Sequence, residues 1–234
     1  MVRRILAGGI AALLAGQALA APECSVPASF PTPHSEAASN REPARLRPIA
    51  GYTLSLIWTP EQCRNGGHDR GTIACGQARG FVLHGLWPEG KGRDWPQYCA
   101  PAAILPQRTL RAHYCATPSA QLLQHEWAKH GTCISGMTPD RYFALSNRLF
   151  AGISVPDMAG LSRRPGLTAA QVGQAFAKTN PGLRADMVRL QLNRRGWLEE
   201  VWLCLDTVFA PRRCPAGQSG ARDTQAVKIW RGGR

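Results

Sequence analysis

The sequence predicts a disulfide-stabilised α+β domain in which a central, mostly antiparallel sheet packs with helices. Segments of strand composition lie towards both ends of the chain, with helical patterns between them. The 234 residues suffice for one domain with a substantial core. The eight cysteines form an even set without any C-x-x-C pair, which favours four disulfides over a zinc ribbon or a thioredoxin-type site.

The start of the chain has the pattern of a secretory signal peptide. A basic beginning at Arg3 and Arg4 precedes a short apolar run over 5–16, and Ala-Leu-Ala at 18–20 fits a cleavage site. We therefore expect residues 1–20 to be removed on export to a bacterial periplasm or the outside. The apolar run is too short to span a bilayer and no other segment approaches 18 apolar residues, so no membrane anchor is expected.

The first half of the mature chain predicts an arm and two strands. Residues 21–50 are rich in Pro, Ser and Ala, which indicates an irregular N-terminal arm. A strand is predicted over 51–60, and a loop over 61–78 follows it. The segment 80–88 predicts a second strand that is apolar on both faces and hence central in the sheet. A Pro- and Gly-rich loop covers 89–108.

Helices are predicted in the middle of the chain. Helical spacing of apolar residues predicts one helix over 119–130, and a Thr-Pro start predicts another over 138–150. A capping box formed by Thr168 and Gln171 opens a third, which ends about ten residues later.

The end of the chain predicts a strand–turn–strand unit. Segments 187–193 and 197–206 have strand composition and flank a turn at 194–196. The catalytic domain is thus expected over 51–215, with 216–234 as its C-terminal segment or a tail.

The charge of the chain indicates a polyanionic partner. The net charge is +13, and loss of the two arginines of the signal peptide leaves +11. Such an excess attracts nucleic acid or anionic membranes. A soluble basic protein without a polyanionic partner is the alternative.

The stretch HEWAKHGTC (125–133) is close to the zinc-protease motif H-E-x-x-H, but its second histidine comes five residues after the first. On a helix, His125 and His130 are then about 140° apart, which disfavours a shared zinc ion. Glu126 and His130 share a helix face. The alternative is a polar helix end, where Lys129 and His130 suit the helix dipole.

His84 lies among apolar residues in a predicted strand, where a lone histidine is more often a hydrogen-bonded core residue. Gly85 beside it permits close approach of another backbone or of a ligand. Combined with Glu126, Lys129 and His130 on a basic exported chain, His84 nevertheless suggests phosphodiester chemistry. RNA carries its own nucleophile, so two histidines can move the protons while cations stabilise the phosphorane charge. No metal or other cofactor is required.

FVLHGLWP (81–88) and HEWAKHGTC (125–133) resemble the two signature segments of the ribonuclease T2 family of secreted acid ribonucleases, which includes bacterial ribonuclease I-like enzymes. Family-like features extend over 52–214. The resemblance implies an α+β fold and metal-independent cleavage of single-stranded RNA through a 2′,3′-cyclic phosphate, followed by hydrolysis to a 3′-phosphate.

The same resemblance implies a role for each residue of the two segments. His130 is the general base for the 2′-OH, His84 is the general acid for the leaving oxygen, and Glu126 orients His130. His125 and Lys129 bind phosphate and stabilise the transition state.

For base recognition, the resemblance implies that Trp87 stacks on a base and that Trp95 or Tyr98 completes the platform. The alternative for Trp87 is core packing. Many relatives have Asp where this chain has Glu89, so adenine preference is not implied and low base specificity is expected. An aromatic residue usually precedes the second segment, but this chain has two leucines there.

The resemblance also suggests the disulfides. The four pairs are Cys99–Cys133, Cys204–Cys214, Cys63–Cys75 and, by exclusion, Cys24–Cys115.

Two other functions remain as alternatives: a binding protein that holds RNA or another polyanion without cutting it, and a zinc hydrolase. The presence of His84, Glu126 and His130 favours the ribonuclease over the first, and sensitivity to EDTA would identify the second. We expect a monomer whose partner is single-stranded RNA.

Overall fold

The protein is described by a computed structural model that covers residues 24–64, 75, 80–92 and 94–232. The predicted signal peptide and most of the loop predicted over 61–78 lie outside the described residues. The four strands are β1 (Gly51–Trp58), β2 (Phe81–Glu89), β3 (Val188–Leu192) and β4 (Leu198–Leu205). They form one sheet in the order β2-β1-β4-β3 with every neighbouring pair antiparallel. This is the predicted α+β class.

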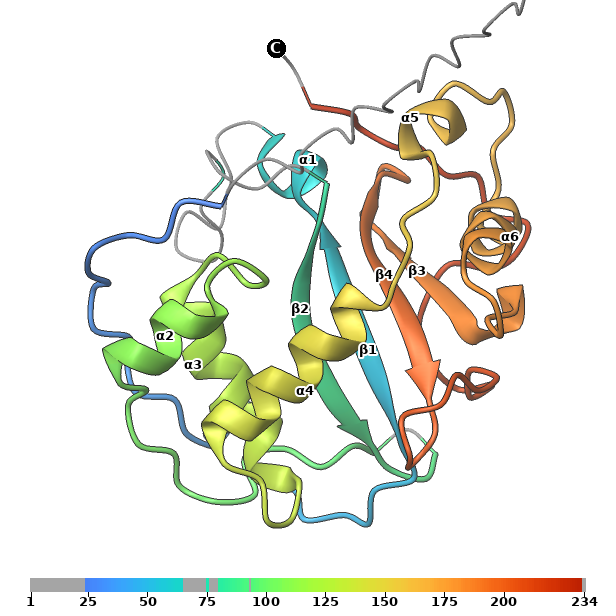
Figure 1. Ribbon diagram of the computed structural model, residues 1–234. Helices are drawn as coiled ribbons and strands as arrows, with labels where there is room; N and C mark the ends of the chain where they lie inside the picture. The colour runs from blue at the N-terminus through green and yellow to red at the C-terminus, as the bar shows by residue number, and fades with distance from the viewer. Residues whose placement is uncertain (1–23, 65–74, 76–79, 93, 233–234) are drawn as a thin grey trace, which may run out of the picture.

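The helices surround this sheet in two groups, as Figure 1 shows. The helices are α1 (Thr59–Gln62), α2 (Gln107–His113), α3 (Ala120–Lys129), α4 (Pro139–Ala151), α5 (Met158–Leu161) and α6 (Ala169–Thr179). Two 3₁₀ turns cover Gly131–Cys133 and Ala185–Met187. Helix α4 crosses the sheet over β1 and β2, α3 contacts β2, and α6 contacts β3. No helix in the described part of the chain is both long and apolar enough to cross a membrane.

Capping residues set the start of each helix that the sequence predicts. The side chains of Ser119, Thr138 and Thr168 each accept a hydrogen bond from a backbone N–H of the first turn of α3, α4 and α6. The capping box at Thr168 and Gln171 is present. The sequence did not predict α1, α2 and α5, which are short and lack a clear apolar period. The strand predicted over 51–60 ends at Trp58, and α1 takes its last two residues.

The prediction that β2 is central was wrong, because β2 lies at an edge of the sheet. Its edge is covered instead. Leu83 bonds through its backbone to Ala116 and to the hydroxyl of Thr117, and the Tyr142 hydroxyl bonds to both backbone groups of Leu86. An edge strand that other parts of the chain cover needs no polar side chains to prevent pairing with another molecule. The segment can therefore be as apolar as a central strand.

A β-bulge interrupts β2 at His84. Ser55 pairs with Gly85 and Leu56 pairs with Leu83, which leaves His84 as the extra residue. A bulge redirects the side chain of the inserted residue. His84 is therefore 22% exposed in a strand whose other residues are mostly buried.

Alternation along β1 separates the core from the site. Leu54 and Leu56 are almost fully buried in the main core with Tyr142 of α4. Ser55, between them, points to the opposite face and bonds to Glu200 of β4. The opposite face of the sheet thus carries polar side chains.

The chain ends and the disulfides complete the fold. The arm over 24–50 contains no helix or strand, and the segment after Cys214 packs on the domain with Val227 and Ile229 buried. All eight cysteines are paired as the family resemblance implies, in Cys24–Cys115, Cys63–Cys75, Cys99–Cys133 and Cys204–Cys214.

Candidate active site

A cavity of about 830 Å³ opens between β2, α3, β4 and the loop over 215–220. Eight of the nine side chains predicted for catalysis and for phosphate and base binding line it. They are His84, Trp87, Glu89, Trp95, His125, Glu126, Lys129 and His130. The two signature segments therefore meet in one site, as they must if they act together.

His84 and Glu126 face each other across the cavity. Nε2 of His84 lies 3.4 Å from Oε1 of Glu126, whose carboxylate is 2% exposed. The indole N–H of Trp87 donates to the other oxygen, Oε2, at 2.7 Å. A Cβ atom at Gly85 would collide with this carboxylate. The close approach that Gly85 permits is thus the approach of Glu126.

Glu200 of β4 binds the other nitrogen of His84, and the sequence analysis did not include it. Oε1 of Glu200 lies 2.7 Å from Nδ1 of His84. Its Oε2 accepts hydrogen bonds from Trp202 Nε1 at 2.6 Å and from Ser55 Oγ at 3.1 Å. The pair Glu199 and Glu200 within an otherwise apolar predicted strand was a signal in the sequence, but nothing local linked either residue to His84.

His130 stands just past the end of α3. It is the C-cap residue and its ring, 6% exposed, stacks on Trp87 with 5.5 Å between ring centroids. Within the described residues, its Nδ1 atom is buried without a hydrogen-bond partner. A buried polar atom without a partner marks a place where a further group can bind.

Glu126 does not orient His130 in the way that the resemblance implied. Among the described residues, the Glu126 carboxylate contacts His84 and Trp87, and His130 is fixed by its stacking on Trp87. Among the described residues, the hydrogen bond between Glu126 and His130 is the backbone bond from His130 N–H to Glu126 O.

The two histidines have opposite pKa shifts. Burial lowers the pKa of His130 well below its usual value, and the charges of Lys129, His125 and His84 lower it further. Burial also opposes the charged form of His84, but the hydrogen bond that its ring donates to Glu200 and the charges of Glu126 and Glu200 outweigh burial and raise the pKa of His84. At pH 6.5, the usual pKa of histidine, these directions favour a neutral His130 and a charged His84.

Lys129 and His125, which line the cavity, are each paired with a carboxylate of the N-terminal arm. Lys129 Nζ lies 2.6 Å from Glu42 Oε1, and His125 Nδ1 lies 3.4 Å from Glu36 Oε2. Both residues come from the irregular arm, which contacts α3 at Gln121, His125 and Lys129. The predicted phosphate-binding groups thus already have anionic partners.

Residues 50–214 match the model of the Ribonuclease T2 family. The chain belongs to the Ribonuclease T2 family. As a member of this family it is an endoribonuclease that acts on RNA.

Curated relatives and solved structures agree with this assignment. A ribonuclease of Aeromonas hydrophila is 32% identical over 162 residues, which are 66% of this chain and 71% of that protein. A probable ribonuclease of Haemophilus influenzae is 28% identical over 71% of this chain and 61% of its own. The fold matches that of trichomaglin, described as a novel S-like ribonuclease, with a TM-score of 0.62 and 21% identity over 77% of this chain and 97% of that one.

Of the residues predicted to bind a base, the structure brings three to the cavity of this Ribonuclease T2 enzyme. Trp87 and Trp95 line it, as does Glu89, whose carboxylate accepts a hydrogen bond from Thr53 at 2.7 Å. Burial raises the pKa of Glu89. Tyr98 is 7% exposed and does not line the cavity.

Tyr98 instead supports Lys129. Its hydroxyl donates to Glu42, and the ammonium of Lys129 lies 6.0 Å from the centre of its ring. Leu122 and Leu123, which stand where the resemblance implied an aromatic residue, are buried at 4% and 1% exposure.

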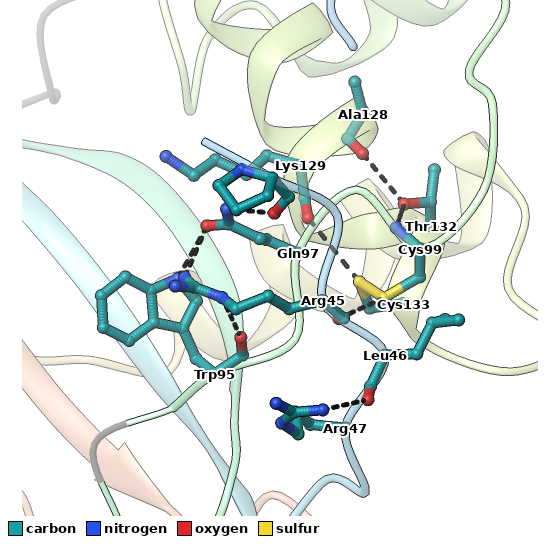
Figure 2. The surroundings of a disulfide bond; sticks show 11 residues. Arg45, Leu46, Arg47, Trp95, Gln97, Cys99, Ala128, Lys129, Thr132 and Cys133 are labelled. Carbon is teal, nitrogen blue, oxygen red and sulfur yellow. Dashed lines mark hydrogen bonds between the residues drawn. A yellow bond between two sulfur atoms is a disulfide. The ribbon is translucent and has the colours of Figure 1, made fainter. Parts of the chain in front are cut away.

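Figure 2 shows how the arm also supports Trp95 beside the Cys99–Cys133 disulfide. The guanidinium of Arg45 stacks 4.4 Å from the centre of the Trp95 ring and donates to the Trp95 carbonyl. Gln97 accepts hydrogen bonds from both side chains. Trp95 keeps 40% exposure, so its free surface remains available to a ligand.

A helical separation of about 140° between His125 and His130 disfavoured a shared metal ion, but the structure does not have this helical geometry at His130. The 140° separation assumes that the helix continues through His130, but α3 ends at Lys129. One ligand atom each from His125, Glu126 and His130 lie within 4.8 Å of one another. Two imidazoles and a carboxylate are a donor set that zinc accepts, so the geometry permits a metal ion at this place.

Proposed function

We propose that the protein is an exported enzyme that cleaves single-stranded RNA with low base specificity, without a metal, through a 2′,3′-cyclic phosphate that it then hydrolyses to a 3′-phosphate. The observation that carries this proposal is that His84 and His130 line one cavity, where their different neighbours shift their pKa values in opposite directions. Groups whose pKa values are pushed apart are suited to separate acid and base roles.

In the first step, neutral His130 removes the proton of the 2′-OH. The 2′-oxygen attacks phosphorus while His84, charged, gives its proton to the leaving 5′-oxygen. In the second step the roles reverse, so His84 activates water and His130 protonates the 2′-oxygen. The lowered pKa of His130 and the raised pKa of His84 support this assignment over the reverse one.

Lys129 and His125 line the same cavity, where Lys129 supplies positive charge and His125 a hydrogen-bond donor for the phosphate and for the phosphorane. Glu126 faces His84 and favours its charged form, which is the form that a general acid needs.

Low base specificity is supported by the kind of residue near the catalytic centre. Trp87 and Trp95 offer indole rings, and stacking on an aromatic ring accepts every base. Nucleotide binding has been seen in a protein of the same fold: the structure of RNase NT is a complex with 5′-AMP, with a TM-score of 0.57 and 19% identity.

Export is supported by the signal-like start of the chain and by four disulfides, which persist in oxidising compartments.

The test is to incubate the mature protein with a short RNA, the same RNA with 2′-O-methyl groups, and DNA, all in EDTA. We expect the RNA to give a cyclic phosphate and then a 3′-phosphate, and the other two to stay intact. His84→Ala and His130→Ala should each lose on the order of 10²–10⁴ in rate. His113→Ala, which changes a histidine outside the cavity, should retain turnover.

Cleavage of the methylated RNA would contradict the role of the 2′-OH. Loss of activity in EDTA, restored by zinc, would instead favour a metal ion held by His125, Glu126 and His130. RNA binding without any cleavage would favour the binding protein.

A further inference from the structure

His84 has a carboxylate at each of its ring nitrogens. Glu126 of α3 lies 3.4 Å from Nε2, and Glu200 of β4 lies 2.7 Å from Nδ1. Glu200 reaches His84 because β1 pairs with both β2 and β4, so two residues 116 positions apart meet across one strand. The shorter contact is the one with Glu200, which has no role in the proposed reaction steps.

Glu200 is held in place and in its ionised form. Its second oxygen accepts from Trp202 and Ser55, and the side chain is 16% exposed. Burial alone would raise the pKa of Glu200, but the hydrogen bond and charge of His84, with the hydrogen bonds from Trp202 and Ser55, keep this pKa below its usual value.

An ionised carboxylate only accepts hydrogen bonds, so the hydrogen between the two residues belongs to Nδ1 of His84. That hydrogen is present in the neutral and in the charged imidazole. The nitrogen that gains and loses a proton is therefore Nε2, which faces Glu126 in the cavity.

We propose that Glu200 is a positioning residue for His84, which fixes the Nδ1–H tautomer and the ring orientation so that Nε2 carries the transferable proton to the leaving oxygen of RNA. This inference rests on the proposed function, in which His84 is the general acid. Glu200 itself touches no reacting atom.

The charged groups around His84 predict how the loss of Glu200 changes its titration. Glu200 from β4 and Glu126 from α3 favour the imidazolium, whereas Lys129 from α3 disfavours it. The ring of His130 stacks on Trp87, and its lowered pKa favours the neutral form, which adds no charge beside His84. When the charge of Glu200 is removed, the effects of Glu126 and Lys129 on His84 oppose each other. The pKa of His84 is therefore expected to fall.

The experiment compares the full mature enzyme with Glu200→Gln. We expect kcat to fall roughly ten- to hundredfold, the range found for carboxylates that orient metal-bound histidines. The alkaline limb of the pH profile should move to lower pH, while affinity for uncleavable 2′-O-methyl RNA is retained. Nitrogen NMR of the imidazole should report Nδ1–H in the neutral ring of the wild type and its loss in the variant.

Two further variants keep the inference testable. Glu199→Gln removes the same charge from the neighbouring residue, which does not line the cavity, and should leave the profile unchanged. Glu200→Asp keeps the charge and should keep the alkaline limb close to its original pH. If Glu200→Gln does not fold, Trp202→Phe removes one hydrogen bond from Glu200 and should shift the limb in the same direction by less.

An unchanged alkaline limb and an unchanged tautomer in Glu200→Gln would overturn the inference. Failure of the proposed function gives a different result: His84→Ala would then keep its turnover, while the NMR spectrum would still report whether Glu200 fixes the tautomer.

Discussion

At the scale of single residues, the site separates two chemically identical side chains by their neighbours. His130 is 6% exposed and stacks on Trp87, and the nearby groups that shift its pKa are cationic. His84 lies on a bulge between two carboxylates. Both rings are desolvated, so the sign of the neighbouring charge decides which one holds a proton.

This difference predicts a bell-shaped pH profile of kcat/KM that extends to both sides of pH 6.5, the usual pKa of histidine. The acid limb reports His130, which no longer acts as a base once it is protonated. Its lowered pKa places this limb below pH 6.5. The alkaline limb reports His84, whose raised pKa places the loss of the acid above it. Measuring kcat/KM of a short RNA across pH tests this, and a rate still rising through pH 9 would contradict it.

The residues of the site were predictable to the extent that they lie in the two signature segments. His84, His125, Glu126, Lys129 and His130 could be identified because each segment holds its groups together in sequence. Glu200 could not, since its contact with His84 depends on the order of strands in the sheet. The bulge that turns His84 into the cavity likewise depends on the pairing with β1.

At the scale of elements, the N-terminal arm is part of the site as well as a tether. It is joined to the domain by Cys24–Cys115, and backbone hydrogen bonds link Arg45 to Gln97. Between these points it places Glu36 beside His125 and Glu42 beside Lys129. The composition of the arm predicted its irregular backbone but not its contacts.

We predict that Glu42→Gln tightens substrate binding, because RNA phosphate and the Glu42 carboxylate compete for Lys129. Glu42 is 47% exposed and Lys129 is 14% exposed. An ion pair of this kind contributes at most about 1 kcal/mol, so KM should fall by about two- to fivefold at low salt, with kcat little changed. Steady-state kinetics would check this.

The matched control for the arm is Asp223→Asn, which makes the same change of charge in the loop beside the start of α6. Equal effects of both variants would mean that only net charge matters. An increase of KM in Glu42→Gln would mean that the arm holds Lys129 in its binding position rather than competing with RNA.

At the scale of the whole molecule, the class of the fold and the disulfides were predictable, and the order of the strands was not. Strand composition at both ends with helices between them is local information, as are the caps of α3, α4 and α6. The position of β2 at the edge was hidden because the covering residues Thr117 and Tyr142 come from other parts of the chain.

The charge of the whole chain gives the last prediction, a steep dependence of substrate affinity on salt. The mature chain is expected to carry +11, and phosphates that it neutralises release counterions. Log affinity for a single strand should fall with log salt by about 0.7 for each phosphate contacted. Lys129→Ala should reduce this slope by about one such contact, whereas Lys178→Ala, which removes the same charge from α6, should leave it unchanged. The measurement is binding of 2′-O-methyl RNA across KCl concentrations. A flat dependence in the wild type would mean that the basic surface does not face the RNA. Equal slopes in both variants would mean that Lys129 does not contact a phosphate.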